Sequence, residues 1–170
     1  QINLTLLETI MMFMSRHGGG RTLRAFALAS AVLLGAGGLA LAARAETAPA
    51  VQTAPGYTSD RLSVEVIGTG PDVIPIPGFG SSREVWRVEA ERLAPTHRVH
   101  LVQLAGFAGE PWSHGDGAFV QPVVDALAAY IEAAGLERPA VIGHSMGGLE
   151  ALMLAQQHPA LVGRVMSVDS

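Results

Sequence analysis

The segment from Pro139 to His158 constrains the fold of this chain more than any other. It begins with an apolar run, passes through Gly143-His144-Ser145-Met146-Gly147-Gly148, and continues into a stretch with the apolar spacing of a helix. Glycines two places before and after Ser145 leave room for a sharp turn, because larger side chains there would collide. This pattern predicts a strand, a nucleophile elbow and a helix, with the Ser145 hydroxyl lifted above the end of a sheet.

The residue types at the predicted elbow suit chemistry on a carbonyl group. Ser145 is the candidate nucleophile, and the backbone N–H of Met146 points to where an oxyanion would form. The helix that begins there adds a partial positive charge on the same side. A bare Gly-x-Ser-x-Gly also occurs in glycine-rich turns with a structural serine, but the flanking strand and helix favour the elbow.

From residue 61 onward, short apolar strands alternate with helical patterns. Strands are predicted over residues 62–66, 72–76, 98–103, 139–142 and 164–168, and helices over 82–93, 119–134 and 149–158. Ser82 is the expected cap of the first helix, and the first strand suits a sheet edge. Pro75 is awkward inside the second strand because it removes a ladder donor. The alternation predicts an α/β fold, a mostly parallel sheet with helices on both faces.

The order of these elements resembles the α/β-hydrolase fold family, in particular its esterase, lipase and hydrolytic haloperoxidase-like members. The resemblance covers roughly residues 62–170 and is carried by the elbow, by Pro77-Gly78-Phe79-Gly80 after the second strand, and by Gly106-Phe107-Ala108-Gly109. It implies an incomplete α/β-hydrolase fold in which the Phe79 N–H is the second oxyanion donor. Pro77 stands where the family often has a histidine, which leaves that backbone donor intact.

The loop after the third strand carries three aromatic residues, Phe107, Trp112 and Phe119. They would either line an acyl pocket or cover the core beneath a long loop, and the sequence leaves both interpretations open.

A serine nucleophile needs a base to take its proton and an acid to orient that base. The family order implied by the resemblance is serine, acid, histidine, and Asp169 just after the last strand is a candidate acid. His158, the only histidine after Ser145, is expected to cap a helix end. His144 points away from Ser145, and His114 reads as a turn residue. We therefore expect the base to be missing from these residues, and the chain to be an inactive N-terminal fragment of a longer enzyme.

The first 45 residues have the pattern of a targeting segment. A basic leader after Met14, itself a candidate start, precedes an uncharged alanine- and leucine-rich run, and Ala43-Arg44-Ala45 offers a cleavage site. A secreted or periplasmic protein is expected. The alternative is an uncleaved anchor, the one case in which a membrane would be a partner. Residues 46–60 read as a flexible Pro/Ala/Thr linker, and residues 61–170 as the hydrolase-like domain.

Charge and composition narrow the partners. Residues 46–170 contain seven arginines and 14 acidic residues, a net charge of −7, which argues against nucleic acid. His114 and Asp116 alone cannot build a metal site, so neither a metal nor another cofactor is expected. The predicted partner is a small-molecule acyl substrate, hydrolysed through an acyl-enzyme. Acyl transfer or perhydrolysis on the same fold, and a non-catalytic hydrolase-like binding protein, stay open as alternatives.

Overall fold

The computed structural model describes Thr9, Met12, residues 52–53 and residues 57–170. The chain divides into two compact units, Asn3–Ala48 and the combination of Gln1–Ile2 with Pro49–Ser170. The fold given below is that of the second unit. Apart from Thr9 and Met12, the expected signal segment over residues 1–45 lies outside the described residues. No helix in the described part of the chain is long and apolar enough to span a membrane.

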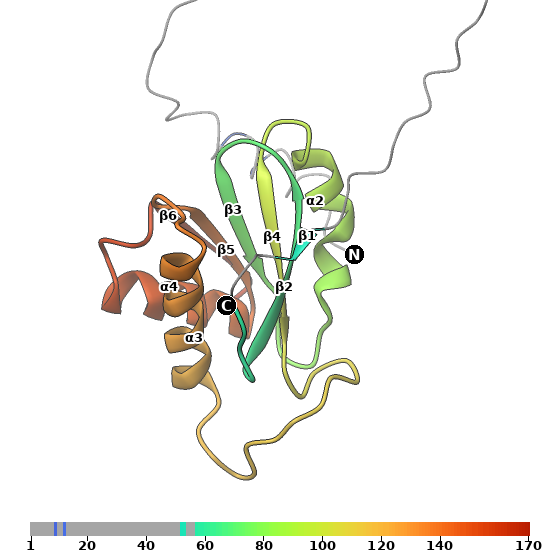
Figure 1. Ribbon diagram of the computed structural model, residues 1–170, viewed down its shortest axis with the longest axis vertical. Helices are drawn as coiled ribbons and strands as arrows, with labels where there is room; N and C mark the ends of the chain where they lie inside the picture. The colour runs from blue at the N-terminus through green and yellow to red at the C-terminus, as the bar shows by residue number, and fades with distance from the viewer. Residues whose placement is uncertain (1–8, 10–11, 13–51, 54–56) are drawn as a thin grey trace, which may run out of the picture. The chain divides into compact units, whose positions relative to one another are not determined.

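The described residues form a six-stranded sheet with the order β1-β2-β4-β3-β5-β6. The bounds are β1 Gln52–Thr53, β2 Leu62–Gly68, β3 Asp72–Ile76, β4 Arg98–Leu104, β5 Ala140–His144 and β6 Arg164–Val168. Pairing is antiparallel between β1 and β2 and between β2 and β4, and parallel among β4, β3, β5 and β6. Helix α2 covers one face, and α3 and α4 cover the other (Figure 1). The expected α/β fold with a mostly parallel sheet is confirmed.

Because four strands run parallel, all of their carboxyl ends lie along one side of the sheet and all of their amino ends along the other. These two sides are called the carboxyl edge and the amino edge below. The carboxyl edge holds the ends of β3, β4, β5 and β6 at Ile76, Leu104, His144 and Val168. The amino edge holds the starts of the same strands. Side chains that follow parallel strands gather at the carboxyl edge, which is where ligands bind in open α/β sheets.

Pro75 lies in a central strand of the sheet, not in an outer strand. Strand β3 pairs with β5 from Val73 to Ile76, but its ladder with β4 consists only of Asp72 with Arg98 and Val73 with Val99. Because proline has no N–H to donate, β3 cannot keep a full ladder to both neighbours. The strand tolerates Pro75 by giving up its pairing to β4 beyond Val73.

Strand β2 is the second strand of the sheet, whereas the sequence suggested that it would be an outer strand. Residues Gln52 and Thr53, within the segment expected to be a linker, pair with Val66 and Glu65 of β2. Tyr57 from the same segment donates its hydroxyl to the Ala126 carbonyl at 2.7 Å. An open strand edge exposes unpaired N–H and C=O groups, and β1 covers part of that edge.

The helices agree with their expected positions, with one difference in the first. Residues Arg83–Trp86 form the 3₁₀ helix η1, which continues as the α-helix α2, Arg87–Leu93. The Ser82 hydroxyl accepts a hydrogen bond from the Glu84 N–H at 3.2 Å, so its predicted capping role is confirmed. Helix α3 is Val120–Ala133 and helix α4 is Met146–Gln157. Gly135, at φ 61°, follows the end of α3 as expected.

Helix α4 turns a different face to the core than its apolar residues suggest. Leu149 and Leu152 are 47% and 50% exposed, whereas Glu150, Ala151 and Leu154 are fully buried. The apolar spacing that predicted this helix therefore does not mark these two leucines as core residues. At the start of α4, Gly147 packs against the end of β3, where a Cβ atom would lie 2.5 Å from the Ile76 carbonyl oxygen.

Candidate functional site

Ser145 occupies the single residue between β5 and α4, with φ 52° and ψ −120°. A positive φ is uncommon for a residue with a side chain, and such conformations cost about 1–3 kcal/mol. The Ser145 N–H donates to the Val168 carbonyl of β6 at 2.9 Å, and its own carbonyl accepts from the Gly148 N–H at 2.9 Å. Bonds to β6 and α4 thus hold the strained backbone in place, in the sharp strand-to-helix turn that the sequence predicts.

The glycines around Ser145 permit this turn through close backbone contacts. A Cβ atom on Gly147 would lie 2.5 Å from the Ile76 carbonyl oxygen and 2.6 Å from that of Pro77. A Cβ atom on Gly143 would collide with the Gly147 backbone. The start of α4 can therefore pack against the end of β3 because Gly147 lacks a side chain, and against β5 because Gly143 does.

The turn after β3 lies beside Ser145. A Cβ atom on Gly78 would be 3.3 Å from the Ser145 Cβ and 3.0 Å from the His144 Nδ1. The Ser81 N–H closes the turn on the Gly78 carbonyl at 3.1 Å. The fold thus brings Phe79, the residue after Gly78, to the same end of the sheet as Ser145.

Two backbone amides flank the serine. Met146 is the first residue of α4, so its N–H has no acceptor within the helix and lies at the positive end of the helix dipole. Within residues 57–170, neither the Met146 nor the Phe79 N–H donates to a backbone carbonyl. Amides with these properties can bind a negatively charged oxygen.

Asp169 directly follows β6 at the carboxyl edge. Strand register places Val168 beside His144, so Asp169 lies alongside the turn at Ser145. It is exposed and has a φ of 50°. No ion pair of its carboxylate is present among residues 57–170. Its role as the acid stays a prediction.

Of the described histidines, His144 lies next to Ser145 in the chain, with its ring beside Gly78, and the others lie elsewhere in the fold. His158 caps the far end of α4, about 18 Å along the helix from its start. His114 contacts the Asp60 carbonyl at 3.1 Å and packs against Trp112. His100 is buried near the amino edge. No hydrogen bond between a described histidine ring and the Ser145 hydroxyl is present in residues 57–170.

The structure places the three loop aromatics at different depths. Phe107 is 8% exposed and belongs to the hydrophobic core, whereas Trp112 and Phe119 are half-buried. Phe107 also contacts Phe79, with 5.1 Å between ring centroids. The loop therefore covers the core at Phe107 and extends an aromatic surface from there to the turn beside Ser145.

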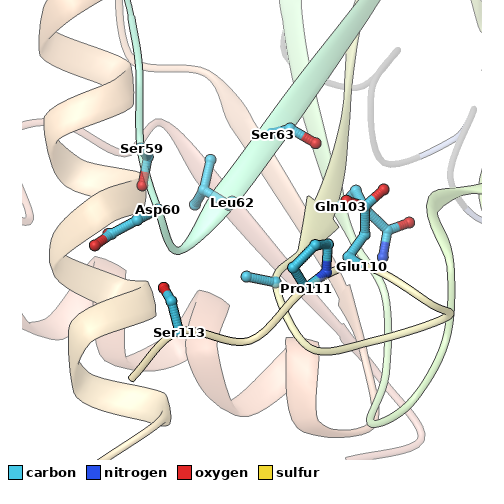
Figure 2. A pocket seen from close by; sticks show the side chains of 9 residues that line it. Ser59, Asp60, Leu62, Ser63, Gln103, Glu110, Pro111 and Ser113 are labelled. Carbon is cyan, nitrogen blue, oxygen red and sulfur yellow. The ribbon is translucent and has the colours of Figure 1, made fainter. Parts of the chain in front are cut away.

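An open pocket of about 250 Å³ lies between the start of β2 and the loop after β4 (Figure 2). It is lined by Ser59, Asp60, Leu62, Ser63, Gln103, Ala105, Glu110, Pro111 and Ser113. None of these residues comes from the elbow or from the turn after β3. The sequence interpretation missed this pocket, because its lining comes from three separate segments with no shared motif.

Partly buried Asp72 and buried His100 and Tyr130 form a second feature that the sequence interpretation missed. The His100 Nε2 lies 2.9 Å from an Asp72 oxygen, and its Nδ1 lies 2.6 Å from the Tyr130 hydroxyl. Burial lowers the pKa of His100, although Asp72 partly opposes this. A neutral ring that donates from Nε2 to Asp72 and accepts at Nδ1 from Tyr130 satisfies all three groups. These residues lie on the amino side of the sheet and pack the fold.

Glu150 is a third unexpected group. Its side chain is fully buried in α4, and neither carboxylate oxygen has a hydrogen-bond partner among the described residues. Burial raises the pKa of Glu150 to about 8. Among the described residues, no group of three or more histidine, aspartate or glutamate side chains could hold a metal ion.

Residues 71–170 match the alpha/beta hydrolase fold family. A similar curated protein is the pimeloyl-[acyl-carrier protein] methyl ester esterase of Aeromonas hydrophila, 37% identical over 110 residues, which are 64% of this chain and 41% of that protein. The chain thus spans about two fifths of the length of this relative.

Solved structures give the same fold. A mutant of a putative epoxide hydrolase from Pseudomonas aeruginosa superposes with a TM-score of 0.61 and 26% identity, over 74% of this chain and 43% of that one. A marine microorganism esterase superposes with a TM-score of 0.58 and 27% identity, over 64% of this chain and 41% of that one. With the family match extending over more than half of its residues, the chain belongs to the alpha/beta hydrolase fold family.

Proposed function

We propose that the natural protein containing this chain is a serine hydrolase that cleaves esters. The observation that carries the proposal is the backbone of Ser145, held at φ 52° at the end of β5 with Gly78 packed against its side chain. That arrangement gathers one hydroxyl and two candidate oxyanion donors, the N–H groups of Phe79 and Met146, at the carboxyl edge.

In the proposed reaction, the Ser145 oxygen attacks the ester carbonyl as its proton passes to a base. Negative charge develops on the carbonyl oxygen, where the Phe79 and Met146 amides hold it. Loss of the alcohol leaves an acyl group on Ser145, and water then releases the acid and restores the serine. Because no described histidine ring is hydrogen-bonded to the hydroxyl, the proposal places the base outside the described residues, with Asp169 as the candidate acid.

The chemistry of serine favours esters over epoxides as substrates. Attack of a serine oxygen on an epoxide carbon would form an ether, which water does not readily cleave, so the enzyme would be trapped after one turnover. Attack on an ester forms another ester, which water can hydrolyse. The relative from Aeromonas hydrophila is named as a methyl ester esterase, which agrees with this choice. By its name, the similar Pseudomonas aeruginosa protein belongs to the epoxide hydrolases.

A fluorophosphonate probe on the full-length natural protein tests the proposal. We expect stoichiometric labelling, mapped by mass spectrometry to Ser145, and loss of that label in Ser145→Ala. Ser167→Ala is a matched control, because Ser167 is an exposed serine in neighbouring β6. A folded protein whose Ser145 does not react would contradict the proposed function.

A further inference from the structure

We infer that Phe79, Phe107, Phe119 and Trp112 form the binding surface for an extended apolar acyl chain on the ester attacked by Ser145. These four residues are called the aromatic row below. The inference rests on the proposed function and adds a substrate class to it, namely esters of medium-chain or arylalkyl acids in preference to acetates.

Ring geometry defines the row. Phe79 meets Phe107 edge to face with centroids 5.1 Å apart, and Phe107 stacks on Phe119 at 4.9 Å. Phe119 then meets Trp112 at 5.3 Å. These spacings are those of favourable aromatic pairs, so the four rings form one continuous row, in which Phe107 is buried, Phe119 and Trp112 are half-buried and Phe79 is exposed.

One end of the row lies at the reacting group. Phe79 follows Gly78, which packs against the Ser145 side chain, and its ring is 76% exposed. No other described aromatic residue is among the large exposed apolar side chains. An exposed apolar surface next to a reactive hydroxyl is where an acyl chain would lose contact with water.

The rest of the row is held in place before any ligand binds. The buried Gln103 amide donates to the Phe107 carbonyl at 3.3 Å and accepts from the Arg83 N–H at 2.9 Å. The Trp112 indole donates to the Gly115 carbonyl at 2.8 Å. The Arg61 guanidinium covers the Trp112 ring at 5.2 Å and closes the far end. A surface fixed in this way requires little ordering when a chain binds to it.

Burial of each methylene group contributes roughly a fourfold gain in binding. The acyl chain is part of the group attacked by Ser145, so the gain should appear in the rate of reaction with the serine. Two fluorophosphonates that differ only in the alkyl group on phosphorus, ethyl or octyl, measure this effect. The readout is the ratio of the octyl to the ethyl labelling rate constant on the full-length protein.

We expect the octyl probe to react at least about tenfold faster than the ethyl probe, and Trp112→Ala to reduce this ratio by about fivefold or more. Phe79→Ala, which keeps the backbone N–H, should reduce it further. Val88→Ala is the matched control, because Val88 is a 54% exposed apolar residue on α2 outside the row. A ratio near one, or a ratio unchanged in both row variants, would overturn the inference while leaving labelling of Ser145 intact.

A binding measurement separates the inference from the proposed function. In Ser145→Ala, which cannot form an acyl-enzyme, methyl octanoate should show NMR Overhauser contacts to the rings of Phe79 and Trp112, and methyl acetate should not. If neither probe labels Ser145, the proposed function fails, and these contacts alone decide the aromatic row. Absence of contacts to the Phe79 and Trp112 rings would refute it.

Discussion

At the amino edge of the sheet, the side-chain polar atoms of Asp72, His100 and Tyr130 are hydrogen-bonded to one another and to Arg98. At the carboxyl edge, by contrast, Ser145 is strained and the amides beside it lack backbone acceptors. Both edges are built from the same parallel strands, so the sheet alone does not explain the contrast. Complete pairing at one edge stabilises the fold. Strain and unpaired donors at the other edge leave groups ready to bind a ligand.

The comparison predicts that substitutions at Ser145 affect reactivity far more than stability. Ser145→Ala should lower reaction with esters or fluorophosphonates by roughly a millionfold, as expected when a nucleophile is removed. Its free energy of unfolding should change by less than about 1 kcal/mol.

Ser145→Gly sharpens the same test, because glycine adopts a positive φ at little cost. It should raise the free energy of unfolding by about 1 kcal/mol while also abolishing labelling. Urea denaturation and labelling kinetics measure the two effects separately. A loss of several kcal/mol in either variant would mean that Ser145 is a structural residue.

At the amino edge, we expect substitutions to affect stability far more than reactivity. Asp72 accepts hydrogen bonds from Arg98 and from the His100 Nε2, and both donors lower its pKa against the opposing effect of burial. Asp72→Ala should lower the free energy of unfolding by about 3 kcal/mol. This is the low end for a buried ion pair, because Arg98 is partly exposed and solvent screens its charge. Arg92→Ala, an exposed arginine on α2, is a matched control. Loss of less than 1 kcal/mol would show that the cluster does not hold the fold together.

Glu150 departs from this contrast, because it is fully buried without a partner. Its folded-state pKa of about 8 exceeds the ordinary 4.5, so the folded protein binds this proton more tightly than the unfolded chain does. Its contribution to stability is complete below about pH 4.5 and is lost as the pH rises toward 8. The slope is about 1.4 kcal/mol per pH unit.

Glu150→Gln removes the titration but keeps the size of the side chain. As the pH rises from about 5.5 to 7.5, the variant should therefore gain about 2–3 kcal/mol of unfolding free energy relative to the parent. Denaturant titrations across this range measure the difference. A pH-independent difference would show that Glu150 is ionised or solvated in the folded protein.

The sequence predicts those features of the fold and of the site that depend on a few adjacent residues. The cap at Ser82, the end of α3 before Gly135 and the turn around Ser145 each rest on a few adjacent residues, and all three were predicted. Periodicity cannot tell which face of a helix meets the sheet, so buried Glu150 and exposed Leu152 were missed.

Contacts between segments that are far apart in the chain could not be predicted from the sequence, for a related reason. Asp72, His100 and Tyr130 come from β3, β4 and α3, and nothing near any of them marks the other two as partners. The contact of Phe79 with Phe107 likewise depends on how two loops leave the sheet. The pairing of Gln52 and Thr53 with β2 was hidden by a composition typical of linkers.

The smallest predicted effect concerns the segment that precedes β2. Tyr57→Phe removes the 2.7 Å hydrogen bond to Ala126 but keeps the ring against Tyr130, so it should cost about 1 kcal/mol of unfolding free energy. Thermal denaturation of the two proteins measures it. An unchanged melting temperature would indicate that this segment does not pack on the domain in solution.

A crystal structure of the full-length protein with a phosphonate bound to Ser145 is the most direct test of the account. The phosphoryl oxygen stands in for the oxyanion of an ester in reaction. We predict that it lies about 2.7–3.1 Å from both the Phe79 and the Met146 amide nitrogens. A phosphoryl oxygen that turns toward solvent, with neither amide within hydrogen-bond distance, would contradict the account.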